Sequence, residues 1–93
     1  MAAAVKLGRH LKELRIHLCQ KSAASKGVRE FIETQYVPLK KSNPKFPILI
    51  RECSGVNPVV YARYEHGREQ CVPLSDKSSS DVLKTIESLS SKS

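Results

Sequence analysis

Apolar residues recur along the chain with two periods, one typical of strands and one typical of helices. Apolar and polar residues alternate over 14–19, which predicts a strand with one buried face. The segment 48–53 begins with three apolar residues and predicts a second strand, of the kind that is buried on both faces. Residues 59–64 are rich in β-branched and aromatic side chains and predict a third strand. A hairpin-length turn over 65–68 leads into a fourth strand over 69–74.

Two further segments carry apolar side chains at helical spacing. The first covers 28–39, and Ser25 is its expected N-cap. Pro38 has no N–H group to donate to the preceding turn, so we expect a kink or a loosened last turn there. The second helix has its apolar face over 82–89, and the serines at 78–80 are expected to cap it.

The predicted elements follow one another in the order β-α-β-β-β-α. A strand, a helix and a strand in succession form a parallel pair with a right-handed crossover, and the hairpin adds two antiparallel strands. We therefore expect an α/β fold with one four-stranded mixed sheet and two helices, the minimal thioredoxin-like architecture. The domain is expected over 13–90, with a short tail at 91–93. Residues 1–12 form a basic N-terminal tail without acidic residues and are a candidate targeting signal.

Length and charge narrow the class of protein. A chain of 93 residues fits one domain, and it contains no run of 18 apolar residues, so we expect no transmembrane segment. The formal net charge is +7, and the whole excess lies in residues 1–46, which hold ten basic and three acidic side chains. Such a patch favours an anionic partner: phosphate, an anionic membrane face or an acidic protein surface. The alternative is a solvated face on which lysines provide solubility.

Two of the three cysteines end predicted strands, and this placement allows them to pair. Cys19 ends the first strand and Cys53 the second. If these strands are parallel neighbours, both thiols lie at one edge of the sheet, where a spacing of about 4.8 Å between strands suits a disulfide. Cys71 has no partner in this arrangement, and we interpret it as a small buried hydrophobe.

Enzymatic and metal-binding alternatives are weaker. Cys19 opens a strand-to-helix junction of the kind that carries C-x-x-C in thiol oxidoreductases, where a helix N-terminus and Lys21 would lower its pKa. The resolving position is Ser22, so only a monothiol mechanism is left, with Pro58 as the candidate cis-proline beside it. The three histidines and three cysteines lack the close ligand pairs of zinc sites, and no phosphate-binding glycine motif occurs. We expect no catalytic, cofactor or metal site.

Several segments together resemble a known family over roughly residues 11–90. The most specific is the run P-I-L-I-R-E-C-S at 47–54, and the remaining segments are 13–20, 27–33, 39–44, 62–64 and 72–74. They resemble accessory subunit 2 of the alpha subcomplex of mitochondrial NADH:ubiquinone oxidoreductase, respiratory complex I. The resemblance implies a thioredoxin-like, non-catalytic subunit without flavin, quinone or iron–sulfur cluster. The two characteristic cysteines of the family map onto Cys19 and Cys53, which implies a redox-responsive disulfide in the reducing matrix.

The resemblance also implies partners and a location. Other complex I subunits are the expected partners, chiefly the large iron–sulfur subunit of the NADH-oxidising module, on the matrix side of the inner membrane. For contact with an acidic surface of that subunit we expect five basic residues: Arg15, Lys26, Arg29, Arg51 and Arg63. The same domain occurs in certain mitochondrial ribosomal proteins, so RNA binding is the rival function, favoured by the basic first half.

Overall fold

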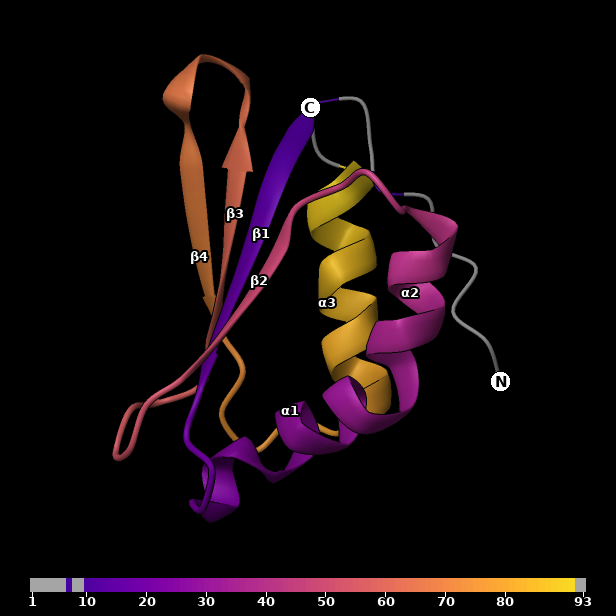
Figure 1. The fold of residues 1–93 in the computed structure, drawn as a ribbon. Coiled ribbons are helices and arrows are strands. Elements are labelled where there is room, and N and C mark those ends of the chain that lie inside the picture. Colours follow the sequence, from indigo (N-terminus) through magenta and orange to yellow (C-terminus); the bar gives the residue numbers. More distant parts are fainter. Residues whose placement is uncertain (1–6, 8–9, 92–93) are drawn as a thin grey trace.

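The structure, a computed structural model, describes residue 7 and residues 10–91, and it has two layers, a sheet and helices (Figure 1). The strands are β1 (Leu11–Leu18), β2 (Ile48–Glu52), β3 (Val59–Tyr64) and β4 (Glu69–Pro73). The helices are α1 (Lys26–Phe31), α2 (Val37–Ser42) and α3 (Ser79–Ser91). The predicted order of strands and helices is confirmed. Most of the expected N-terminal tail, 1–12, and part of the tail 91–93 lie outside the described residues.

The four strands form one mixed sheet in the order β2-β1-β3-β4. β1 is parallel to β2, with Leu14 opposite Ile48 and Leu18 opposite Glu52, and it is antiparallel to β3. β3 and β4 form the predicted antiparallel hairpin. The expected parallel pairing of the first two strands is therefore confirmed, and it places the ends of β1 and β2 at the same edge of the sheet.

The first helical segment runs from α1 into α2 through a wider π-helical turn, Ile32–Tyr36. This turn lies directly before α2, whose second residue is Pro38. Because Pro38 lacks an N–H group and its ring crowds the turn before it, widening that turn keeps the helix continuous. The loosening expected at Pro38 thus lies ahead of the proline rather than in the last turn of the helix.

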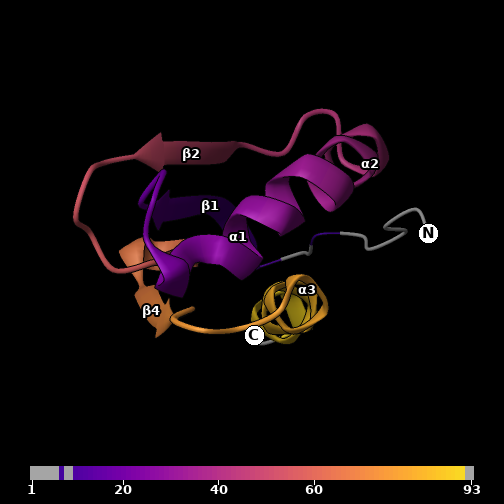
Figure 2. The same ribbon diagram turned by 90° about the horizontal axis from the view of Figure 1, so that it is seen from below.

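The helices α1, α2 and α3 lie against the same face of the sheet, which leaves the other face uncovered by the described chain (Figures 1 and 2). Fully buried aliphatic and aromatic side chains fill the space between the layers. They come from β1 (Leu14, Ile16, Leu18), β3 (Val60, Ala62), the helical segment 26–42 (Val28, Phe31, Leu39) and α3 (Val82, Ile86, Leu89). The Tyr64 hydroxyl donates to the carbonyl oxygen of Leu89 at 2.6 Å, which ties the sheet to the last turns of α3.

The first helix passes very close to the loop that precedes α3. A Cβ atom at Gly27 would lie 1.6 Å from the carbonyl oxygen of Lys77, so only glycine fits there. Ser78 accepts a hydrogen bond from the backbone N–H of Asp81 at 3.2 Å, as predicted for a cap of the second helix.

Several local features differ from those expected or considered from the sequence. β2 is an edge strand in a sheet with one covered face, so Leu49 is 37% exposed and the strand is not buried on both faces. Cys71 is exposed on β4 and not part of the core. Pro58 is preceded by a trans peptide bond, as are all the residues that the structure describes. β1 also begins earlier than predicted, because an irregularity between Leu11 and Glu13 breaks the alternation there.

Candidate functional site

The uncovered face of the sheet gathers side chains from all four strands. We call it the open sheet face, and the strand register assigns to it Glu13, Arg15, His17, Leu49, Arg51, Val59, Tyr61, Arg63, Glu69, Cys71 and Pro73. Its central row runs across the strands from Leu49 through Arg15 and Tyr61 to Cys71. Polar, aromatic and apolar side chains alternate with the buried ones along each strand, as expected for a sheet with one covered face.

Tyr61 lies in the middle of the open sheet face and is held by two neighbours. The ring centroid of His17 is 5.0 Å from that of Tyr61, with the rings inclined by 58°. The guanidinium carbon of Arg15 lies 5.9 Å from the same centroid, within the range of a cation–π contact. Arg15 forms ion pairs with Glu13 and with Glu69, each at 3.0 Å. The charge of Arg15 is therefore balanced within the chain, and its main effect is to fix Tyr61.

Two arginines of the open sheet face are exposed and have no ion pair among the described residues. Arg51 lies on β2 opposite His17, and Arg63 lies on β3 opposite Glu13 and Glu69. Three of the five predicted contact residues, Arg15, Arg51 and Arg63, thus come together on one surface. Lys26 is exposed at the start of α1, in the helical layer.

Arg29 has a different environment from the one expected for a contact residue. Its guanidinium donates hydrogen bonds to the carbonyl oxygens of Cys19 at 2.9 Å and Ser22 at 2.8 Å. These bonds tie α1 to the loop after β1. Arg29 therefore braces the loop that holds Cys19, and its charge is directed into the molecule.

The parallel pairing of β1 with β2 brings Cys19 and Cys53 to the same edge of the sheet. They follow Leu18 and Glu52, which are opposite one another in the parallel ladder, and the Cys53 N–H donates to the Leu18 carbonyl oxygen at 2.9 Å. Cys19 is buried and Cys53 is exposed, and all three cysteines are free thiols in the structure.

Backbone groups from two loops surround the Cys19 sulfur. The N–H groups of Lys21 and Gly55 donate to Sγ at 3.5 and 3.4 Å. Because such bonds favour the thiolate, they lower the pKa of Cys19 to about 7, with a further contribution from Ser22. The amide of Lys21, rather than the positive charge of its side chain, is the main cause. The Ser25 hydroxyl, expected as a helix cap, instead accepts from the Cys19 N–H at 3.1 Å.

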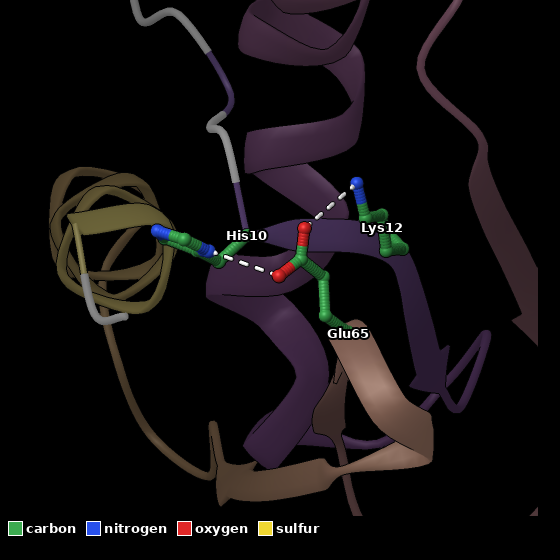
Figure 3. Close-up of polar contacts among 3 residues, drawn as sticks. All are labelled: His10, Lys12 and Glu65. Carbon is green, nitrogen blue, oxygen red and sulfur yellow. Dashed lines mark hydrogen bonds and ion pairs between the residues drawn. The ribbon is translucent and has the colours of Figure 1, made fainter.

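The other end of β1 carries a polar cluster that the sequence analysis missed (Figure 3). Glu65 follows β3 directly. Its carboxylate forms a hydrogen bond with His10 Nδ1 at 3.2 Å and an ion pair with Lys12 Nζ at 3.5 Å. The hydrogen bond with His10 is the main cause that lowers the pKa of Glu65. The cluster ties the start of β1 to the turn between β3 and β4. Because His10 and Glu65 are 55 positions apart, no local sequence pattern indicates that they meet.

Comparison with known proteins gives consistent matches over most of the chain. Residues 28–79 match the family model of the mitochondrial ribosomal protein L51 / S25 / CI-B8 domain. A mouse protein named NADH dehydrogenase [ubiquinone] 1 alpha subcomplex subunit 2 is 49% identical, over 95% of this chain and 87% of its own. An Arabidopsis thaliana protein of the same name is 52% identical, over 89% of this chain and 86% of its own. The NADH-ubiquinone oxidoreductase 10.5 kDa subunit of Neurospora crassa is 43% identical, over 85% of this chain and 84% of its own length.

Proposed function

Because the chain belongs to the family of NADH dehydrogenase [ubiquinone] 1 alpha subcomplex subunit 2, we propose that it is a non-catalytic accessory subunit of mitochondrial respiratory complex I. The observation that carries this proposal is the identity of about half of all residues to relatives of that name, over nearly the whole chain. The chain would lie on the matrix side of the inner membrane, bound to other subunits. Among residue 7 and residues 10–91, no helix is long and apolar enough to cross a membrane.

The subunit would dock on the NADH-oxidising module, chiefly against its large iron–sulfur subunit, and support assembly or stability of that module. The guanidinium groups of Arg51 and Arg63 are exposed and form no ion pair within residues 10–91. They support docking to an acidic protein surface, because planar guanidinium groups bind carboxylates with paired hydrogen bonds.

Cys19 and Cys53 would form a redox-responsive pair. Oxidation would join the two sulfurs and transfer two electrons and two protons to an oxidant such as glutathione disulfide. Two observations support the pair. Cys19 and Cys53 each follow one member of the pair Leu18–Glu52 in the parallel ladder, which brings them to one edge of the sheet. The amides of Lys21 and Gly55 stabilise the Cys19 thiolate, which would attack the sulfur of Cys53 in a mixed disulfide. Mass spectrometry of the full chain without reductant would then detect a Cys19–Cys53 cross-link, which Cys71→Ser preserves and Cys53→Ser abolishes. Free thiols at both positions under oxidising glutathione would contradict the pair.

The experiment that tests the main proposal is native gel fractionation of mitochondrial complexes containing a tagged full-length chain. We expect the tag to migrate with NADH dehydrogenase activity. Migration with the mitochondrial ribosome would replace the proposal with the RNA-binding function that the family model and the basic first half also permit.

A further inference from the structure

We infer that the open sheet face, and not the helical layer, is the surface through which this chain binds its neighbour in the complex, and that the neighbour presents an apolar group flanked by carboxylates. The inference rests on the proposed function and adds to it the surface and the chemistry of the partner. Tyr61 is the anchor of this surface, and Arg51 and Arg63 are its cations without an ion pair in the described part of the chain.

The basic residue types differ between the open sheet face and the helical layer, and this difference supports the assignment. The cationic side chains of the open sheet face are arginines and one histidine, whereas the described lysines other than Lys12 lie on helices and loops. Lys12 lies at the irregular start of β1 and pairs with Glu65. A face that is merely solvated is usually rich in lysine and glutamate. Protein interfaces favour arginine and tyrosine and are depleted in lysine, because lysine loses more hydration and more freedom on binding.

The centre of the open sheet face is already ordered in the free chain. Tyr61 is half-buried, its ring lies close to both His17 and Arg15 of the neighbouring β1, and Arg15 is itself fixed by Glu13 and Glu69. A partner therefore binds a ring that has little rotational freedom left to lose, which is a common feature of interface hot spots. Apolar groups of Leu49 and Val59 adjoin this centre and give it area that a partner can cover.

The two free arginines define what the partner must carry. Arg51 and Arg63 lie on opposite sides of Tyr61 along the strand direction, two strands apart and four residues apart along the sheet, which corresponds to roughly 16 Å between their Cα atoms. Carboxylates at that separation on a neighbouring protein would pair with both. A second copy of this chain would bring the same arginines and the same net charge of +7, so it is disfavoured as the occupant.

The test compares two double charge reversals in the tagged full-length chain, expressed in cells that lack their own copy. Arg51→Glu with Arg63→Glu changes the open sheet face, and Lys41→Glu with Lys84→Glu makes the same change of charge on exposed positions of α2 and α3. Thermal melting of each purified variant confirms that it folds. We expect the first pair to lower the fraction of tag that migrates with NADH dehydrogenase activity at least tenfold, and the second to change it less than twofold. Tyr61→Ala should lower it as well.

The outcomes separate this inference from the proposed function. If the unmodified chain fails to migrate with NADH dehydrogenase activity, the proposed function is wrong, and the inference, which rests on it, is lost with it. If it does migrate there and the Arg51/Arg63 variant incorporates equally well, or the Lys41/Lys84 variant is lost instead, the inference alone is wrong. The inference would also be overturned if the unmodified chain bound ribosomal RNA and the Arg51/Arg63 variant did not, because the anionic partner would then be nucleic acid.

Discussion

The two faces of the sheet differ completely in chemistry although they alternate along the same strands. On β1, Ile16 is fully buried beneath the helices, whereas its neighbours Arg15 and His17 belong to the open sheet face. The covered face is aliphatic and holds the two layers together. The open sheet face has ion pairs, a ring contact and free guanidinium groups. The difference predicts that folding depends on the covered face and, as we infer, binding on the other, so substitutions on the two faces should have separable effects.

The largest expected effect comes from the closest approach within the covered layer. Gly27→Ala places a methyl group 1.6 Å from the Lys77 carbonyl oxygen, so α1 must move away from the loop before α3. We expect a loss of about 4 kcal/mol or more in the free energy of unfolding, enough to unfold a small domain. Circular dichroism during thermal unfolding measures it. Gly67→Ala is the control: its φ of 74° is strained for alanine, but nothing crowds its Cβ, so about 1 kcal/mol is expected.

Adjacent residues of β1 test the comparison between the faces directly. Ile16→Ala removes fully buried aliphatic volume and should lower the free energy of unfolding by about 3 kcal/mol. His17→Ala removes a partly exposed ring beside Tyr61 and should lower it by about 0.5 kcal/mol. Chemical denaturation of the two variants measures both values. Equal losses would show that the open sheet face contributes to folding as much as the core.

Arg29 should behave as a structural residue rather than a docking residue. Arg29→Ala removes two charged hydrogen bonds to the carbonyl oxygens of Cys19 and Ser22, and we expect a loss of about 2 kcal/mol. Arg63→Ala, on the open sheet face, should change the free energy of unfolding by less than about 0.5 kcal/mol. Denaturant midpoints compare the two. A neutral Arg29→Ala variant would return Arg29 to the set of docking candidates.

The smallest effect is the titration of Cys19. With its pKa lowered to about 7, the buried Cys19 should be half ionised near pH 7, whereas an ordinary thiol has a pKa of 9.0. The difference in ultraviolet thiolate absorbance between the unmodified chain and Cys19→Ser measures this ionisation without a reagent. The lowered pKa also fixes the direction of a stability change: ionisation of Cys19 stabilises the folded chain fully above pH 9, and this stabilisation is lost as the pH falls to about 7. Cys19→Ser should lack this part of the pH dependence. A Cys19 ionisation profile centred near pH 9 would contradict the role of the Lys21 and Gly55 amides.

Sequence patterns predicted the local structure better than the long-range contacts. Strand 59–64 matches β3 because alternation and β-branched residues act locally, and the parallel pairing of β1 with β2 follows from their connection by a helix. The exposure of Leu49 depends on how many layers cover the sheet, which one strand cannot reveal. Likewise, the bonds from Gly55 to Cys19 and from His10 to Glu65 join residues far apart in the sequence.

The candidate site was predicted in part for the same reason. Charge alone selected all five basic residues as contacts, since the sequence does not show which guanidinium groups already have partners. The fold separates them: Arg29 binds carbonyl oxygens, Arg15 binds carboxylates, and Arg51 remains unpaired among the described residues. The bounds 13–90 for the domain and the targeting role of 1–12 stay predictions.

Cys71 offers the most direct measurement, because it is an exposed thiol in the same cross-strand row as Tyr61. Alkylation of the unmodified protein would be followed by mass spectrometry, both for the free chain and for the chain within the purified complex. We predict that assembly slows the alkylation of Cys71 at least tenfold, while amine-reactive labels still reach Lys41 and Lys84 on the helices. Equal labelling of Cys71 in both states, with protection of the two lysines, would contradict binding through the open sheet face.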